Sequence, residues 1–152
     1  MRVVAIAAVL LIVPMPLISC AGKLPSNLGV SDAGLAPCGS SPNCVSSDAR
    51  DSAHQVPPLR LAVAPLEAWR AARELVLELP RTRIVSETAD YLHAECRSAL
   101  FGFVDDFELH LRPTDGIIAV RSASRLGYSD LGVNRRRVEN VRASLISRGV
   151  LR

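Results

Sequence analysis

The stretch from Val120 to Arg137, VRSASRLGYSDLGVNRRR, has the composition of an anion-binding loop. Its guanidinium groups can donate paired hydrogen bonds to phosphate or carboxylate oxygens, and its serine and asparagine side chains add further donors. The run from Arg135 to Arg137 falls in the first turn of a predicted helix, where the helix dipole disfavours positive charge, so a negative group is expected nearby. We predict ligand-binding roles for five residues of this stretch: Arg121, Arg125, Ser129, Asn134 and Arg135.

The negative charge that these arginines need can come from inside or outside the protein. Internal candidates are Asp105 and Asp106 on the preceding predicted strand, and Asp130 within the stretch itself. External candidates are a phosphate, an anionic lipid headgroup, an acidic glycan or a protein partner. Internal compensation is favoured, with Asp105 and Asp106 as structural charge partners. Asp105 alternates with apolar residues such as Phe107, so we predict that it is buried and paired with Arg125 or with loop amides.

Two predicted strands carry ionisable side chains at alternate positions, His93 and Glu95 on one, and Asp106 and Glu108 on the next. Alternation places these groups on the face of the sheet that points away from the helices. We expect Glu95 beside Asp106, His93 beside Glu108, and Arg121 opposite Asp106. The favoured interpretation is a solvated face of cross-strand ion pairs, and no catalytic residue is assigned. The alternative is a hydrolase that performs general acid–base chemistry with Asp105, Asp106, Glu108 and His93.

Hydrophobic periodicity predicts the elements that position these residues. An edge strand at 59–63 precedes a helix that Pro65 starts and Pro80 ends. A closing helix is expected from 131–134 to about 147, with the apolar side chains of Val138, Val141, Leu145 and Ile146 facing inward and Gly149 as the stop. Between the helices lies a meander of four strands, at 83–87, 91–98, 103–111 and 117–123. The order β-α-β-β-β-β-α predicts an α+β fold, a mainly antiparallel sheet covered by two helices on one face.

The N-terminal residues are typical of an exported protein. Arg2 precedes an apolar run at 3–18 that is shorter than the ~20 residues a spanning helix needs, so residues 1–19 are interpreted as a signal peptide. The run ends in LISC, which resembles the lipobox of bacterial lipoproteins and implies that Cys20 carries lipid. In such lipoproteins a residue other than Asp after the cysteine favours the outer membrane, and here it is Ala21. A plain secretory signal and an uncleaved anchor are the alternatives.

Residues 20–53 are rich in glycine, serine and proline and predict a lipidated, flexible arm before a single domain at 54–152. Cys38 and Cys44 lie in this arm, separated by small and turn-forming residues, and an oxidising compartment favours a disulfide between them. Half of a metal site is the competing interpretation, but no second CxxC or paired histidine lies nearby and His54 alone is a poor partner, so we expect no metal and no cofactor.

Three segments resemble the signatures of the family called domain of unknown function 1499 (DUF1499): CGSSPNCVSS, LFGFVDDFE and VRSASRLGYSDLGVNRRR. The resemblance implies a shared compact module and assigns no activity. A formal net charge of +3 gives no electrostatic case for nucleic acid. The sequence therefore predicts an envelope lipoprotein facing the periplasm, attached to the membrane by lipid, that serves as a non-catalytic binding or structural module.

Overall fold

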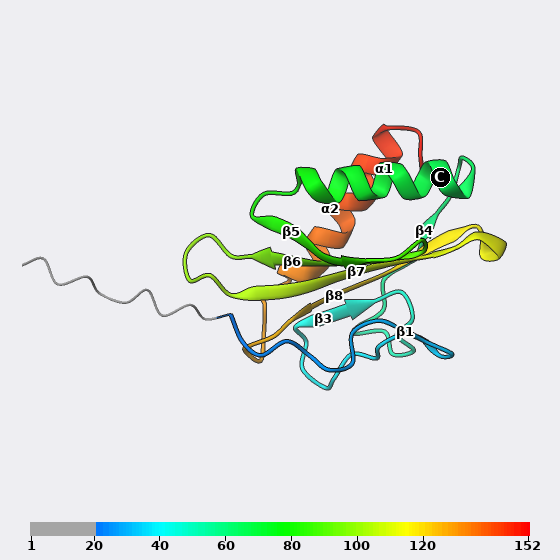
Figure 1. The fold of residues 1–152 in the computed structure, drawn as a ribbon. Coiled ribbons are helices and arrows are strands. Elements are labelled where there is room, and N and C mark those ends of the chain that lie inside the picture. The colour runs from blue at the N-terminus through cyan, green and yellow to red at the C-terminus, as the bar shows by residue number, and fades with distance from the viewer. Residues whose placement is uncertain (1–20) are drawn as a thin grey trace, which may run out of the picture.

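The computed structural model describes residues 21–152, so the predicted signal peptide and Cys20 lie outside the described part of the chain. A six-stranded sheet carries both helices on one face, as Figure 1 shows. The strand order is β3-β8-β7-β6-β5, β4 also pairs with β8, and every strand pair of this sheet is antiparallel. The predicted α+β class is confirmed. The main elements are β3 (Cys44–Ser46), β4 (Leu59–Arg60), α1 (Pro65–Glu78), β5 (Thr82–Glu87), β6 (Tyr91–Arg97), β7 (Val104–Arg112), β8 (Ile117–Ser124) and α2 (Val133–Ser147).

Both helices form where the apolar spacing and the terminating residues predict them. Pro65 occupies the first turn of α1, where its missing N–H costs nothing, and the helix ends just before Pro80. Gly149 adopts a φ of 72° after α2, a conformation that glycine reaches without strain. The predicted inward face of α2 is right for Val138, Val141 and Leu145 but wrong for Ile146, which is half exposed because it lies at the edge of the apolar stripe. Within residues 21–152, neither helix has the length and apolarity to cross a bilayer.

The hydrophobic core lies between the helices and the sheet. Phe107, Leu109, Ile118 and Val120 point from β7 and β8 into this layer and are fully buried. Trp69 packs into the same core from α1. Because side chains alternate along a strand, the ionisable neighbours of these residues point to the other face.

The N-terminal segment differs from the predicted flexible arm. Residues 44–46 form β3, which pairs Cys44 with Ala123 and Ser46 with Arg121 of β8. A small hairpin of β1 (Val30–Ser31) and β2 (Gly34–Leu35) precedes it. Figure 1 shows this part of the chain across the face of the sheet opposite the helices, and we call residues 21–56 the cover. The sequence analysis missed this strand because three residues are too few to show a strand periodicity.

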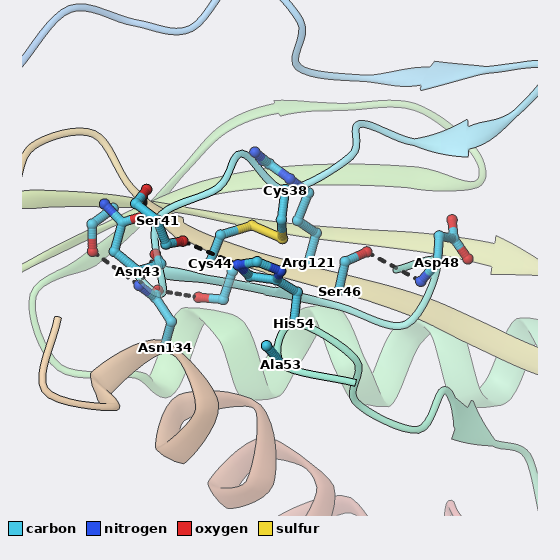
Figure 2. Close-up of a disulfide and its surroundings, with 12 residues drawn as sticks. Cys38, Ser41, Asn43, Cys44, Ser46, Asp48, Ala53, His54, Arg121 and Asn134 are labelled. Carbon is cyan, nitrogen blue, oxygen red and sulfur yellow. Dashed lines mark hydrogen bonds between the residues drawn. A yellow bond between two sulfur atoms is a disulfide. The ribbon is translucent and has the colours of Figure 1, made fainter. Parts of the chain in front are cut away.

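The predicted disulfide between Cys38 and Cys44 is present, with the two Cα atoms 5.6 Å apart. Figure 2 shows this bond beside His54 and Arg121. Ring nitrogens of His54 lie 2.7 Å from Asp51 Oδ1 and 3.1 Å from the carbonyl oxygen of Ser41. The disulfide thus closes a loop at the start of β3, and the imidazole of His54 ties that loop to the following turn.

Candidate functional site

The ionisable face of the sheet is buried, not solvated as the sequence predicted. His93, Glu95, Asp106 and Glu108 each expose 5% or less of their surface, and Arg121 exposes 6%. The cause is the cover, which lies over this face and removes it from water. A buried ion pair must be fully hydrogen-bonded to persist, because desolvation of both charges is costly. The contacts on this face meet most of that demand, and Arg121 Nε is the one buried side-chain polar atom of residues 21–152 without a hydrogen-bond partner.

Glu108 is the centre of the first cluster. It accepts hydrogen bonds from Arg121 Nη1 at 2.6 Å, from the Tyr91 hydroxyl at 2.8 Å and from the Gly29 amide of the cover at 3.0 Å. Burial, together with the Glu108 charge, raises the pKa of Tyr91 above its usual range. Through these three donors, the buried carboxylate on β7 connects its strand to β6, to β8 and to the cover.

The register between β7 and β8 differs from the prediction by two residues. Arg121 pairs with Glu108, not with Asp106, whose partner on β8 is Ala123. The reason is that β7 continues to Arg112 before a short 3₁₀ turn, so the hairpin closes later than expected. A shift of two keeps each side chain on its predicted face. The register between β6 and β7 is confirmed, with Glu95 opposite Asp106 and His93 opposite Glu108.

Asp106 is the centre of the second cluster. It accepts hydrogen bonds from Arg125 Nη2 at 2.6 Å and Nε at 3.0 Å, and His93 Nε2 lies 2.8 Å from its Oδ1. Arg125 also donates to Glu95 Oε1 at 2.8 Å. Burial acts to raise the pKa of Asp106, but the hydrogen bonds from His93 and Arg125 outweigh it and hold that pKa below its ordinary value. The Arg125 side chain is 4% exposed, so its donors are used inside the protein.

Asp105 is mostly buried, as predicted, but its cation comes from another element. It accepts hydrogen bonds from Arg137 Nη2 and from the Ser124 hydroxyl, both at 2.6 Å. The predicted partner Arg125 is wrong because Arg125 lies with Asp106 on the covered face, whereas Asp105 points towards the helices. The helix α2 therefore supplies the charge.

Asn134 fastens the start of α2 to the sheet and the cover. Its side chain is fully buried, accepts a hydrogen bond from the Ser122 hydroxyl at 2.6 Å, and donates to the carbonyl oxygen of Asn43 at 2.9 Å. Figure 2 shows this contact between the helix and the disulfide-bearing loop. The guanidinium of Arg135 donates to the carbonyl oxygens of Gln55 and Ala53. These two predicted ligand-binding residues therefore join segments of the chain.

The remaining predicted residue, Ser129, shapes the turn before α2. Its hydroxyl accepts a hydrogen bond from the Leu131 amide at 3.2 Å. The adjacent Asp130 accepts from the amides of Gly132 and Asn134, so Asp130 satisfies amides at the start of the helix. Much of the negative charge that the arginine run needs is therefore internal, from Asp130 and Asp105.

An open pocket of about 450 Å³ lies on the face of the sheet that carries the helices. It is bordered by the end of α1, the paired strands β5 and β6, and the start of α2. We call it the arginine pocket, because its lining includes Arg81, Arg97, Arg136 and Arg137. Asp105 is the one carboxylate residue in that lining, and Arg137 is bonded to it.

Two guanidiniums of the arginine pocket have no acidic partner. Arg81 Nε donates to the carbonyl oxygen of Arg97 at 3.2 Å, and Arg136 Nη1 donates to that of Leu131 at 2.8 Å. Among residues 21–152, no carboxylate lies within ion-pair distance of either side chain. Both residues are exposed, so their remaining N–H donors face solvent. The sequence analysis missed Arg81. This residue lies between the end of α1 and the start of β5, and no local motif marks it.

Cys96 also lines the arginine pocket, as a buried free thiol. Burial raises the pKa of this thiol, and the Thr82 hydroxyl donates to its sulfur at 3.4 Å. This environment does not activate the thiol, because a nucleophilic cysteine needs a lowered pKa.

The comparison with known protein families decides the assignment. A family described as protein of unknown function (DUF1499) matches residues 34–145, which is well over half of the chain. The chain belongs to the DUF1499 family. The match begins inside the cover and ends in α2, so both the disulfide and the arginine pocket fall within the DUF1499 segment. Comparisons with curated proteins and with solved structures give no match.

The groups of the alternative hydrolase are not assembled at an opening of this DUF1499 domain. His93, Asp106 and Glu108 lie beneath the cover, whereas Asp105 lines the arginine pocket on the other face. General acid–base catalysis needs a carboxyl or imidazole within hydrogen-bond reach of a substrate. Within the described range 21–152, no group of three or more histidine, cysteine, aspartate or glutamate side chains is placed to hold a metal ion.

Proposed function

We propose that this DUF1499 protein is a non-catalytic binding module that takes up an anionic group in the arginine pocket. The observation that carries the proposal is the pair Arg81 and Arg136, two exposed guanidiniums that face an open pocket and have no carboxylate partner among the described residues. A guanidinium presents donors that match the oxygens of a phosphate or carboxylate. We thus assign the external anion, one of the two alternatives from the sequence, to the arginine pocket. Arg81 and Arg136 were not among the five residues predicted to bind a ligand.

The contrast with the other arginines supports this choice. Arg121, Arg125 and Arg137 are each bonded to a carboxylate, so binding an external anion there requires breaking an ion pair of the fold. Such a break leaves a buried aspartate or glutamate without its cation, at a cost of about 3–5 kcal/mol. Arg81 and Arg136 carry no such cost, because they share their contacts only with backbone carbonyl oxygens.

The proposed location is the cell envelope, with the protein anchored by lipid on Cys20 in the periplasmic leaflet of the outer membrane. The support is the segment LISC after a basic start and a short apolar run. The disulfide between Cys38 and Cys44 agrees with an oxidising compartment. Mass spectrometry of the protein from its own membranes tests this, since a diacylglycerol on an N-terminal Cys20 is expected. An unmodified Cys20 contradicts the lipid anchor.

Anion binding is tested by titrating the protein with inorganic phosphate and with glycerol 3-phosphate while NMR follows the arginine Nε–H signals. The signals of Arg81 and Arg136 are expected to shift in a saturable way. The variant Arg81→Gln/Arg136→Gln is expected to lose binding and to keep its melting temperature.

The matched control for this titration is Arg60→Gln/Arg70→Gln, which removes the same charge from two exposed arginines outside the pocket. Binding that survives in the control and is lost in the pocket variant supports the proposal. Equal weakening in both variants indicates non-specific attraction to net charge and contradicts it, as does the absence of any saturable shift. A shift with glycerol 3-phosphate but not with phosphate points to a lipid-derived headgroup.

A further inference from the structure

Large apolar side chains are exposed together at one end of the domain. Leu131 exposes 83% of its surface, Leu100 80% and Tyr128 76%. Single exposed apolar residues are ordinary, but a cluster of large ones on a folded domain marks an interaction surface. We call this surface the apolar end, and define it by Leu100, Phe101, Phe103, Leu126, Tyr128 and Leu131.

The apolar end is formed by two loops that leave neighbouring strands side by side. One loop joins β6 to β7 and the other joins β8 to α2. Val104, the first residue of β7, pairs with Arg97 of β6 and accepts a hydrogen bond from the Arg125 amide at 3.1 Å, so both loops start at the same edge. The rings of Phe101 and Phe103 lie 5.8 Å apart between centroids, which extends the apolar surface across the first loop. Figure 1 shows both loops at the left of the molecule.

The described chain also begins at this end. Gly22 lies so close to the second loop that a β-carbon on it would come within 2.8 Å of Arg125 Cβ and 3.0 Å of Leu126 Cγ. Its φ of 66° favours glycine at this close approach. Ala21 is therefore held beside the apolar end, and Cys20 is the next residue towards the N-terminus. A lipid on Cys20, as proposed above, would therefore be attached one residue from the segment that lies beside the apolar end.

Positive charge borders the same surface. The lining of the arginine pocket includes Ser98 and Ala99 of the first loop, and Val133, which follows the second loop at the start of α2. Arg81 and Arg136 therefore lie next to the apolar end. Exposed apolar side chains flanked by arginines are the composition of surfaces that bind anionic membranes, because apolar groups enter the acyl boundary while cations contact headgroup phosphates.

We propose that the apolar end docks on the surface of the lipid bilayer, with Phe101, Tyr128 and Leu131 at the boundary between headgroups and acyl chains. The proposal rests on the proposed membrane attachment at Cys20, but it does not require an anion in the arginine pocket. Docking fixes the orientation of the domain, because the loops between β6 and β7 and between β8 and α2 then face the membrane. The apolar contact made by docking adds to the membrane affinity that the lipid on Cys20 supplies.

The test uses the full chain as the cell processes it, extracted from membranes in detergent and reconstituted into vesicles of phosphatidylethanolamine and phosphatidylglycerol with brominated acyl chains. Bromine quenches tryptophan only at close range, so emission reports insertion. The variant Tyr128→Trp places a probe at the apolar end, and Leu66→Trp is the control, an exposed apolar position at the start of α1. Trp69 is buried in the core and contributes the same background to both.

We expect brominated lipid to remove most of the added emission in Tyr128→Trp and little of it in Leu66→Trp. Adding Phe101→Ser and Leu131→Ser to the probe variant is expected to restore the emission. Equal quenching of both probes, or failure of the protein to associate with vesicles, overturns the proposal. A detergent-stable dimer that those serine substitutions abolish, without quenching, instead assigns the apolar end to a second copy of this chain. The phosphate titration is independent of these outcomes.

Discussion

The covered face of the sheet and the arginine pocket use the same residue type to opposite effect, with arginines of β8 and the loop after it on the covered face, and arginines before β5 and in α2 in the pocket. On the covered face, Arg121 and Arg125 are almost fully buried and bonded to carboxylates. In the pocket, Arg81 and Arg136 are exposed and bonded only to backbone carbonyl oxygens. Pairing and burial, not the presence of arginine, therefore separate a charge that stabilises the fold from a charge that is free to bind.

The comparison is tested most strongly by Arg121→Ala. This change leaves Glu108 buried without its cation, so we expect the free energy of unfolding to fall by about 3–5 kcal/mol. Urea unfolding of the full chain measures it. The double variant Arg121→Met/Glu108→Leu is expected to recover part of the loss, because it removes the orphaned charge. A loss below about 1 kcal/mol in Arg121→Ala would show that the covered face is solvated after all.

A smaller loss is expected when the cover is loosened. Cys38→Ser/Cys44→Ser removes the disulfide at the start of β3, and the entropy of so short a loop predicts a loss of about 2 kcal/mol. Hydrogen exchange is expected to become faster at the β3 amides before it does in the core strands. Unchanged exchange at β3 would indicate that hydrogen bonds to β8 and α2 hold the cover without the disulfide.

A change of pH acts on the covered face through Asp106. Its pKa is lower in the folded protein than in the unfolded chain, so the stability it gives is complete above the ordinary value of about 4 and is lost as the pH falls through the folded-state pKa. Urea unfolding between neutral and acidic pH is expected to show this decline, and Asp106→Asn is expected to make it shallower. Identical pH profiles for the wild type and the variant contradict the assignment.

The smallest effect on stability is expected in the arginine pocket. Arg136→Gln removes a guanidinium that has no acidic partner, so the free energy of unfolding should change by no more than about 0.5 kcal/mol. Thermal unfolding beside Arg121→Ala measures the contrast between the two regions. A large destabilisation by Arg136→Gln would place this arginine in the fold instead of the binding surface.

Local pattern predicted the elements well where the hydrophobic period is strong. The bounds of α1, β6, β7 and β8 agree with the sequence prediction to within about one residue, because their buried faces repeat at helical or strand spacing. The strand predicted at 59–63 is shorter in the structure, where β4 spans Leu59–Arg60, and β3 was not predicted. Such short segments owe their conformation to hydrogen bonds with β8, which no local pattern encodes.

The candidate site was predicted less well than the fold. The sequence identified that the loop after β8 is rich in arginine and that Asp105 and Asp106 are structural charge partners, and the ion pairs agree with the latter. It paired Asp105 with the wrong arginine, because the choice between Arg125 and Arg137 depends on where α2 packs. It also omitted Arg81, which only the approach of α1 and α2 brings to the pocket.

Alternation and helical spacing are properties of the backbone alone, so the sequence was sufficient to predict the α+β plan and the face on which each strand residue lies. It predicted the disulfide on a separate ground, the short spacing of Cys38 and Cys44 in a chain expected to be exported. Whether those faces meet water depended on the tertiary structure. The cover buries the ion pairs of a face that the sequence predicted to be solvated. The packing of α2 determines that Arg137 pairs with a carboxylate and that Arg136 does not. The physical reason is that the energy of a charge depends on its surroundings, and those are set by segments far apart in the chain.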